Sequence, residues 1–141
     1  MSNQETMRLI QEALDAHEAA IKKSTALPTE RLSTRFQMGQ REVVLRNVLY
    51  QMVAHPREHS TEIKKILAMT DAPRATEAQD IMAQARESMA NFLANFTSLE
   101  DRDLDRHFEG DERTIRAILQ HVREGHLYVL NAIDKALESQ A

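Results

Sequence analysis

The chain has 141 residues, with 18 Lys and Arg against 22 Asp and Glu, which gives a formal net charge of −4. This length is typical of a single domain, so we expect one domain over residues 1–141. Cys is absent, which excludes disulfides, thiolate metal sites and cysteine nucleophiles. The chain has no basic stripe, no signal-peptide pattern and no run of about 18 apolar residues. We therefore expect a soluble cytoplasmic protein that binds neither nucleic acid nor membranes.

Helix-forming residues dominate the composition, with only 3 Gly, 3 Pro and no Trp. Apolar residues recur every three to four positions in four segments, which predicts helices at 4–24, 41–68, 76–97 and 112–139. Each segment carries one apolar stripe on an otherwise charged helix, a pattern typical of a four-helix bundle. No strand pattern competes with these helices, so the predicted fold class is all-α.

An internal repeat relates the two halves of the chain. The segment 27–36 (LPTERLSTRF) matches 99–108 (LEDRDLDRHF) at an offset of 72, and 45–55 matches 115–125 at an offset of 70. The chain is therefore interpreted as a duplicated unit of helix, long loop and helix. Because neither helical pair alone can bury its apolar stripe, we expect the two units to pack face to face about a pseudo-twofold axis.

The two predicted connections, 25–40 and 98–111, are longer than an antiparallel pair of helices needs. We expect them to fold apolar side chains back over the ends of the bundle, namely Leu32, Phe36, Leu104 and Phe108.

Three of the six histidines occupy positions typical of metal ligands. His55 and His59 are four residues apart, so their rings lie on one face of the 41–68 helix, in line with its apolar stripe. His121 lies at the edge of the stripe of the 112–139 helix. Three inward imidazoles that leave one coordination position open are typical of a catalytic site for zinc, nickel or another divalent ion. We predict a metal site formed by His55, His59 and His121.

A duplicated helical bundle with HxxxH on one long helix and a single His on its repeat partner resembles the DinB/YfiT-like family of metalloenzymes. The resemblance covers nearly the whole chain and rests on the stretches QREVVLRNVLYQMVAHPREHSTEI and DERTIRAILQHVREGHLYVLNAI. It implies a divalent metal, zinc or nickel, and a low-molecular-weight thiol as a second cofactor, because relatives in the family include thiol-dependent S-transferases. It also implies that the chain can form a homodimer.

This sequence departs from the family pattern, which places the single His early in the second helix and the HxxxH in the fourth. Those places are taken here by Gln51, Gly125 and Val129, none of which can replace an imidazole. The three candidate ligands stand at the repeat partners of these positions. The resemblance therefore implies a complete triad that is exchanged between the two halves.

Pro56 lies between the two candidate ligands of the 41–68 helix. It removes one backbone hydrogen bond, so we expect the helix to kink or to restart there. Such an interruption either turns His55 and His59 toward one point or disrupts their shared face. Glu62, within a turn of the ligands, either orients an imidazole or faces solvent.

The other histidines have simpler interpretations. His17 is expected to face the core from the first helix, as a packed histidine or a partner of a ligand rather than as a ligand. His107 lies in the second long loop, where we expect it to be exposed, and His126 lies to the side of the fourth stripe.

Two functions follow from these features. The first is a metal-dependent transferase or hydrolase that directs a thiol or water at a small electrophilic substrate. The alternative is a non-catalytic structural or interaction bundle, dimeric, with a structural metal or none. A water-filled cleft of roughly several hundred Å³ above the histidines favours the first, and a pocket closed by Met52, Tyr128 and Val129 favours the second.

Overall fold

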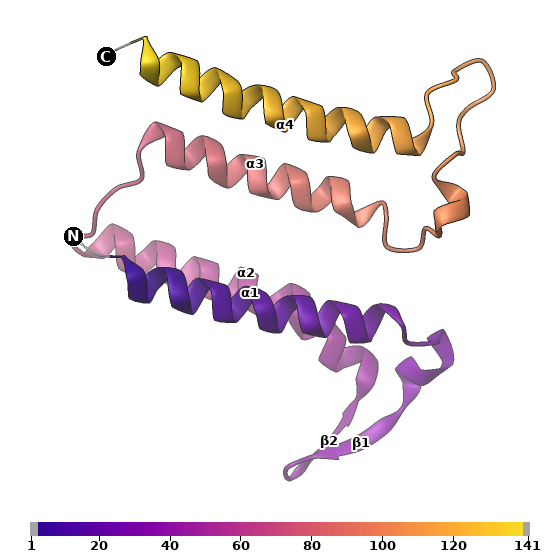
Figure 1. The fold of residues 1–141 in the computed structure, drawn as a ribbon. Helices are drawn as coiled ribbons and strands as arrows, with labels where there is room; N and C mark the ends of the chain where they lie inside the picture. Colours follow the sequence, from indigo (N-terminus) through magenta and orange to yellow (C-terminus); the bar gives the residue numbers. More distant parts are fainter. Residues whose placement is uncertain (1–2, 140–141) are drawn as a thin grey trace. The chain divides into compact units, whose positions relative to one another are not determined.

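The computed structural model describes residues 3–139. It contains four helices, shown in Figure 1: α1 (Gln4–Thr25), α2 (Leu45–Met69), α3 (Glu77–Ala94) and α4 (Ile115–Glu138). The prediction of a mostly helical chain with four helices is confirmed. The predicted bounds of the second to fourth helices extend too far, because the residues that precede α2 and α4 and follow α3 belong to the connections.

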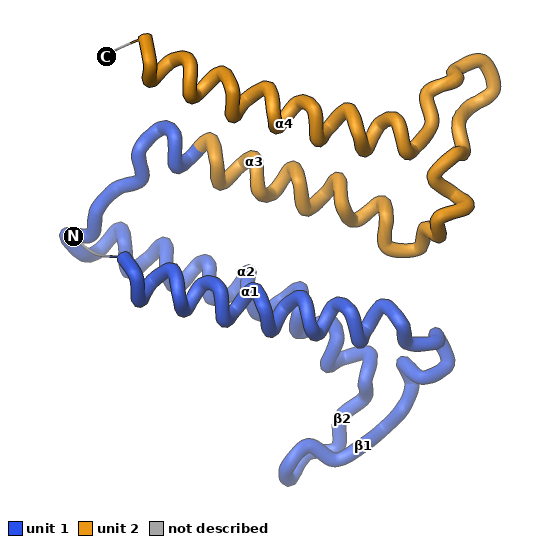
Figure 2. Tube along the Cα trace, viewed as in Figure 1, with its two compact units in different colours: residues 1–80 blue, residues 81–141 orange. Residues whose placement is uncertain are grey.

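The chain divides into two compact units, Met1–Asp80 and Ile81–Ala141, coloured separately in Figure 2. The first unit contains α1, α2 and the first residues of α3. The second unit contains the remainder of α3 and the whole of α4. The candidate histidines are therefore divided between units, with His55 and His59 in the first and His121 in the second.

A β-hairpin connects α1 to α2, in a segment where no strand was expected. Strands β1 (Arg35–Met38) and β2 (Arg41–Val44) pair in antiparallel fashion. The loop between them has two residues and begins with Gly39, whose φ of +62° suits the first central position of a type II′ turn. The expectation of helix from residue 41 was wrong because four residues of strand are too few to display a period of two beside a long helical pattern.

A short 3₁₀ turn begins each long connection, η1 (Thr29–Ser33) in the first unit and η2 (Asp101–Asp103) in the second. After the turns, the same backbone hydrogen bond recurs. The Leu45 N–H donates to the carbonyl of residue 34 at 3.0 Å, and the Ile115 N–H donates to the carbonyl of residue 106 at 3.1 Å. The donors and acceptors are related by the sequence offsets 70 and 72, so the local structure follows the repeat into the first turn of each helix.

Ion pairs take the place of the hairpin in the second unit. Arg116 Nε and Nη2 donate to the two carboxylate oxygens of Asp105 at 2.9 and 3.3 Å. Arg106 Nε donates to Asp103 at 2.6 Å. The hydrogen bond from Arg116, followed by its charge, holds the pKa of Asp105 below its ordinary value. This connection is therefore organised by charge rather than by strand pairing.

Three of the four apolar side chains that were expected to fold back over the bundle, Leu32, Phe36 and Leu104, are half-buried. Their place over the end of a bundle stays a prediction. Phe108 is instead 78% exposed, because the segment around it forms no hairpin that could fold it back. The expectation for Phe108 was wrong.

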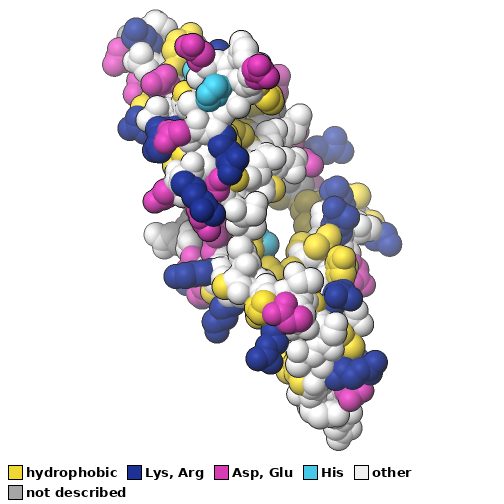
Figure 3. Space-filling model, turned by 90° about the vertical axis from the view of Figure 1, so that its right-hand side faces the viewer, with side chains coloured by type: hydrophobic (Ala, Val, Ile, Leu, Met, Phe, Trp, Pro, Cys, Tyr) yellow, Lys and Arg dark blue, Asp and Glu magenta, His cyan; other side chains and the backbone are white. Residues whose placement is uncertain are grey.

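No residue between 3 and 139 is buried, so neither unit encloses a core of its own. Much of each helical stripe stays exposed, as Ile63 (55%) in α2 and Leu137 (66%) in α4 illustrate. Figure 3 shows one face on which apolar side chains lie among charged ones. Within the same residues, no helix combines the length and apolarity needed to cross a bilayer.

Candidate metal site

The candidate site lies on α2, which is helical without a break from Leu45 to Met69 even though Pro56 stands inside it. The expected restart at Pro56 therefore does not occur. As a result, His55 and His59 remain on one face of one helix, separated by a little more than one turn.

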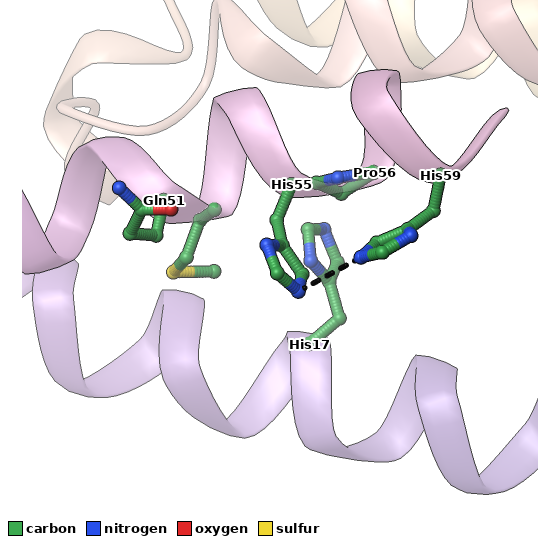
Figure 4. Close-up of a pocket in the computed structure, with 6 residues that line it drawn as sticks. His17, Gln51, His55, Pro56 and His59 are labelled. Atoms are coloured by element: carbon green, nitrogen blue, oxygen red, sulfur yellow. Dashed lines mark hydrogen bonds between the residues drawn. The ribbon is translucent and has the colours of Figure 1, made fainter. Parts of the chain in front are cut away.

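The two imidazoles converge on one point. Nε2 of His55 and Nε2 of His59 lie 3.2 Å apart, and the ring centroids are 4.4 Å apart at an interplanar angle of 80° (Figure 4). Two nitrogens bound at about 2.1 Å to one tetrahedral ion would stand roughly 3.4 Å apart. The spacing therefore suits two ligands of a shared ion, and it also suits a hydrogen bond between the two rings.

Glu62 binds the ring of His59 through Nδ1, the nitrogen that does not face His55. The Nδ1–H of His59 donates to Glu62 Oε2 at 2.5 Å, which leaves Nε2 to face His55. This hydrogen bond, and then the charge of Glu62, raises the pKa of His59, with a smaller charge effect from Glu58. A carboxylate on the far nitrogen of an imidazole is the usual partner of a metal-binding histidine.

A pocket of about 440 Å³ opens beside the pair, between α1 and α2 of the first unit. It is lined by His17, Gln51, Met52, His55, Pro56 and His59. The pocket is open to solvent, since Met52 is half-buried and the other five lining residues are exposed.

His17 rises from α1 toward the two α2 rings (Figure 4). Among the residues that the structure describes, neither His17 nor Gln51 has a hydrogen-bond or ion-pair partner. His17 was expected to be a packed histidine or a partner of a ligand, because helical spacing assigns a face within one helix but does not show which residues of two helices face each other.

The ligand set is incomplete as the side chains stand. Within residues 3–139, no three His, Asp or Glu side chains are arranged so that they could hold a metal ion. His121 lies on α4 in the second unit, and its convergence with the α2 pair remains a prediction. His107 is exposed as expected, with Nδ1 at 2.8 Å from the Phe108 carbonyl and 3.0 Å from the Asp111 carbonyl.

Comparison of the chain with protein-family models, curated proteins and solved structures gives no match. The resemblance to the DinB/YfiT-like family therefore rests on the motifs alone.

Proposed function

We propose that the chain is a metal-dependent enzyme whose divalent ion is bound by His55 and His59, with His121 predicted from the sequence as the third ligand. In this proposal the two repeated units form a four-helix bundle of the DinB/YfiT-like type. The observation that carries the proposal is the 3.2 Å approach of the two Nε2 atoms beside Glu62.

The residues at the site fit such an ion in three ways. Imidazole nitrogens suit zinc and nickel, and both rings direct Nε2 toward the same point. Glu62 fixes the tautomer of His59 that leaves Nε2 as the ligating atom. The pocket supplies space beside the pair for a small molecule, with Met52 and Pro56 as apolar wall residues and Gln51 as a polar one.

A divalent ion held by these histidines would supply a hydroxide or thiolate nucleophile, because it would lower the pKa of a water or thiol bound at an open position. Since the chain has no Cys, a thiol would have to come from a small cofactor. We favour transfer of a low-molecular-weight thiol to a small electrophile, with hydrolysis as the variant in which water is the nucleophile.

A second candidate function is a non-catalytic interaction bundle, in which a homodimer forms and any metal is structural. The observation that favours it is the absence of buried residues between 3 and 139, since large exposed apolar stripes are typical of surfaces that bind a partner.

Metal binding by purified, metal-depleted protein tests the proposal. We expect cobalt(II) to bind in equimolar amount with a visible absorption band, and His55→Ala and His59→Ala each to lose most of that binding. His126→Ala, which removes an exposed imidazole from α4, is the matched control. Unchanged binding in both α2 variants would reject the proposal.

The zinc- and nickel-loaded proteins should then be assayed with a panel of small thiols and electrophiles. Thiol consumption that depends on the metal and on His55 supports the enzyme. A large loss of thermal stability with a chelator, without any reaction, supports the structural alternative.

A further inference from the structure

His17 is the histidine of the first unit that the proposed function leaves without a role. It lies on α1 between Leu14 and Ile21, in the apolar stripe whose residues recur every three to four positions. Its ring points toward the α2 pair across the same pocket (Figure 4). An imidazole at this place has three simple explanations: it is packed, it is hydrogen-bonded, or it binds a ligand.

The second explanation does not fit the contacts, because His17 has no hydrogen-bond or ion-pair partner within residues 3–139. No neighbouring group therefore fixes its orientation, and its exposed side chain is accessible to a ligand. The polar groups that share its pocket are Gln51 and the two converging imidazoles of α2, one of which is already fixed by Glu62.

We propose that His17 is the third protein ligand of the ion, so that His17, His55 and His59 complete a three-imidazole site within the first unit. This inference rests on the proposed function for the α2 pair, and it differs from it in one ligand: His17 takes the third position, which the proposed function gives to His121. The ligand class is a divalent ion that prefers nitrogen donors, as zinc and nickel do.

The three rings do not yet form a ligating set, so His17 must turn about its two side-chain torsions and α1 must adjust toward α2. Little resists this movement, because the residues of α1 around the pocket are exposed rather than held in a packed core. Metal sites are commonly completed on binding, when the free energy of coordination orders the ligands.

A consequence follows for the first unit as a whole. An ion on His17 and His55 cross-links α1 to α2 across the whole connection that contains η1 and the hairpin. The second unit has no counterpart, since the repeat partners of His17, His55 and His59 are Met89, Gly125 and Val129. The inferred cross-link therefore stabilises one of the two units and leaves the other unchanged.

The test is a cobalt(II) titration of the full-length chain with two parallel variants, His17→Ala and His121→Ala. We expect His17→Ala to weaken binding by roughly 100-fold or more, beyond the 10- to 100-fold typical for a residue that only supports a ligand. We also expect its visible absorption band to change, because the ion loses a nitrogen donor. The His121→Ala variant should bind as the unmodified chain does.

Hydrogen exchange supplies a second measurement. Bound zinc should slow the exchange of α1 amides in the unmodified chain but not in His17→Ala. His17→Gln, which keeps a polar side chain of similar size, shows whether any loss in His17→Ala arises from altered folding, and both variants are checked for helix content by circular dichroism.

The outcomes separate this inference from the proposed function. Weak binding in His121→Ala, alone or together with weak binding in His17→Ala, would overturn the claim that the first unit suffices. Unchanged binding and an unchanged band in His17→Ala would overturn the role of His17, while the proposed function stands as long as His55→Ala and His59→Ala lose the ion. If those two variants also retain it, the proposed function fails as well.

Discussion

The α2 helix carries an imidazole pair and a supporting carboxylate where α4, at the same places of the repeat, carries Gly125, Val129 and Ala132. Both helices nevertheless begin with the same backbone hydrogen bond to the preceding connection. The repeat thus produces the same junction at the start of α2 and of α4, whereas the imidazole pair and its supporting carboxylate are present on α2 alone of these two helices. A repeated scaffold therefore does not require a repeated site.

The connection before α2 and the connection before α4 are held by different interactions. In the second unit Arg116 pairs with Asp105, but the equivalent Arg46 has Ser33 at the corresponding place and makes no ion pair with a residue that the structure describes. The first unit has strand pairing instead, with an ion pair between Arg35 and Glu42 across the hairpin. The same junction of loop and helix can thus be held by a hairpin or by charges.

The largest effect is expected from moving the imidazole pair from α2 to α4. His55→Ala with His59→Ala should abolish cobalt(II) binding, and adding Gly125→His with Val129→His should restore part of it. A Cβ at Gly125 meets no other atom within 4 Å, so the new ring has space.

Restored binding should be weaker than in the unmodified chain, because Met89 stands where α1 has His17. Both this variant and its control also carry His121→Ala, because His121 would otherwise form a four-residue pair with a histidine at 125. The control places the second histidine at Leu127 rather than at Val129, since residues two apart do not face each other on a helix. Equal binding by the control and the transplanted pair would show that spacing on the helix does not matter.

Glu62→Gln should have the next largest effect. A loss of about 10- to 100-fold in metal affinity at high pH is expected, since the carboxylate that orients His59 is removed. The same change should lower the pKa of His59 in the metal-free protein, because Glu62 raises it. Binding needs the neutral ring, so the pH midpoint of metal binding should shift downward.

The pKa of His59 in the metal-free chain can be followed by the chemical shifts of its ring protons. Glu58→Gln is the matched control, because Glu58 affects His59 only through a smaller charge effect. If Glu62→Gln left the pKa unchanged, the hydrogen bond would not govern the protonation of His59.

The helix starts provide a smaller contrast. The Thr114 side chain accepts a hydrogen bond from the Ala117 N–H at 3.1 Å, whereas Val44 at the start of α2 offers no such acceptor. Thr114→Ala should therefore lower the free energy of unfolding by about 1 kcal/mol, measured by urea denaturation. Thr114→Ser keeps the acceptor and should lose much less, so equal losses in the two variants would argue against the cap.

The α2 pair could be predicted from the sequence because residues four apart share a helical face whatever the tertiary structure. The hairpin could not, since strands of four residues beside Gly39 carry little periodicity. Continuity of the helix through Pro56 also depends on surroundings that local rules do not include. The place of His17 required coordinates, because it depends on how α1 lies against α2.

The smallest effect concerns the pH dependence of the Asp105 ion pair. The pKa of Asp105 is lowered from its ordinary value of 3.8, so its contribution to stability is present above that value and is lost as the pH falls through the folded-state pKa. Arg116→Gln should therefore reduce the midpoint of thermal unfolding slightly at neutral pH and have less effect in acid. Arg46→Gln is the matched control from the first unit, and it should show no such pH dependence. A similar pH dependence in both variants would contradict this prediction. The ion pair of Arg116 would then contribute no more to stability than Arg46 does, and the two connections would not be held by different interactions.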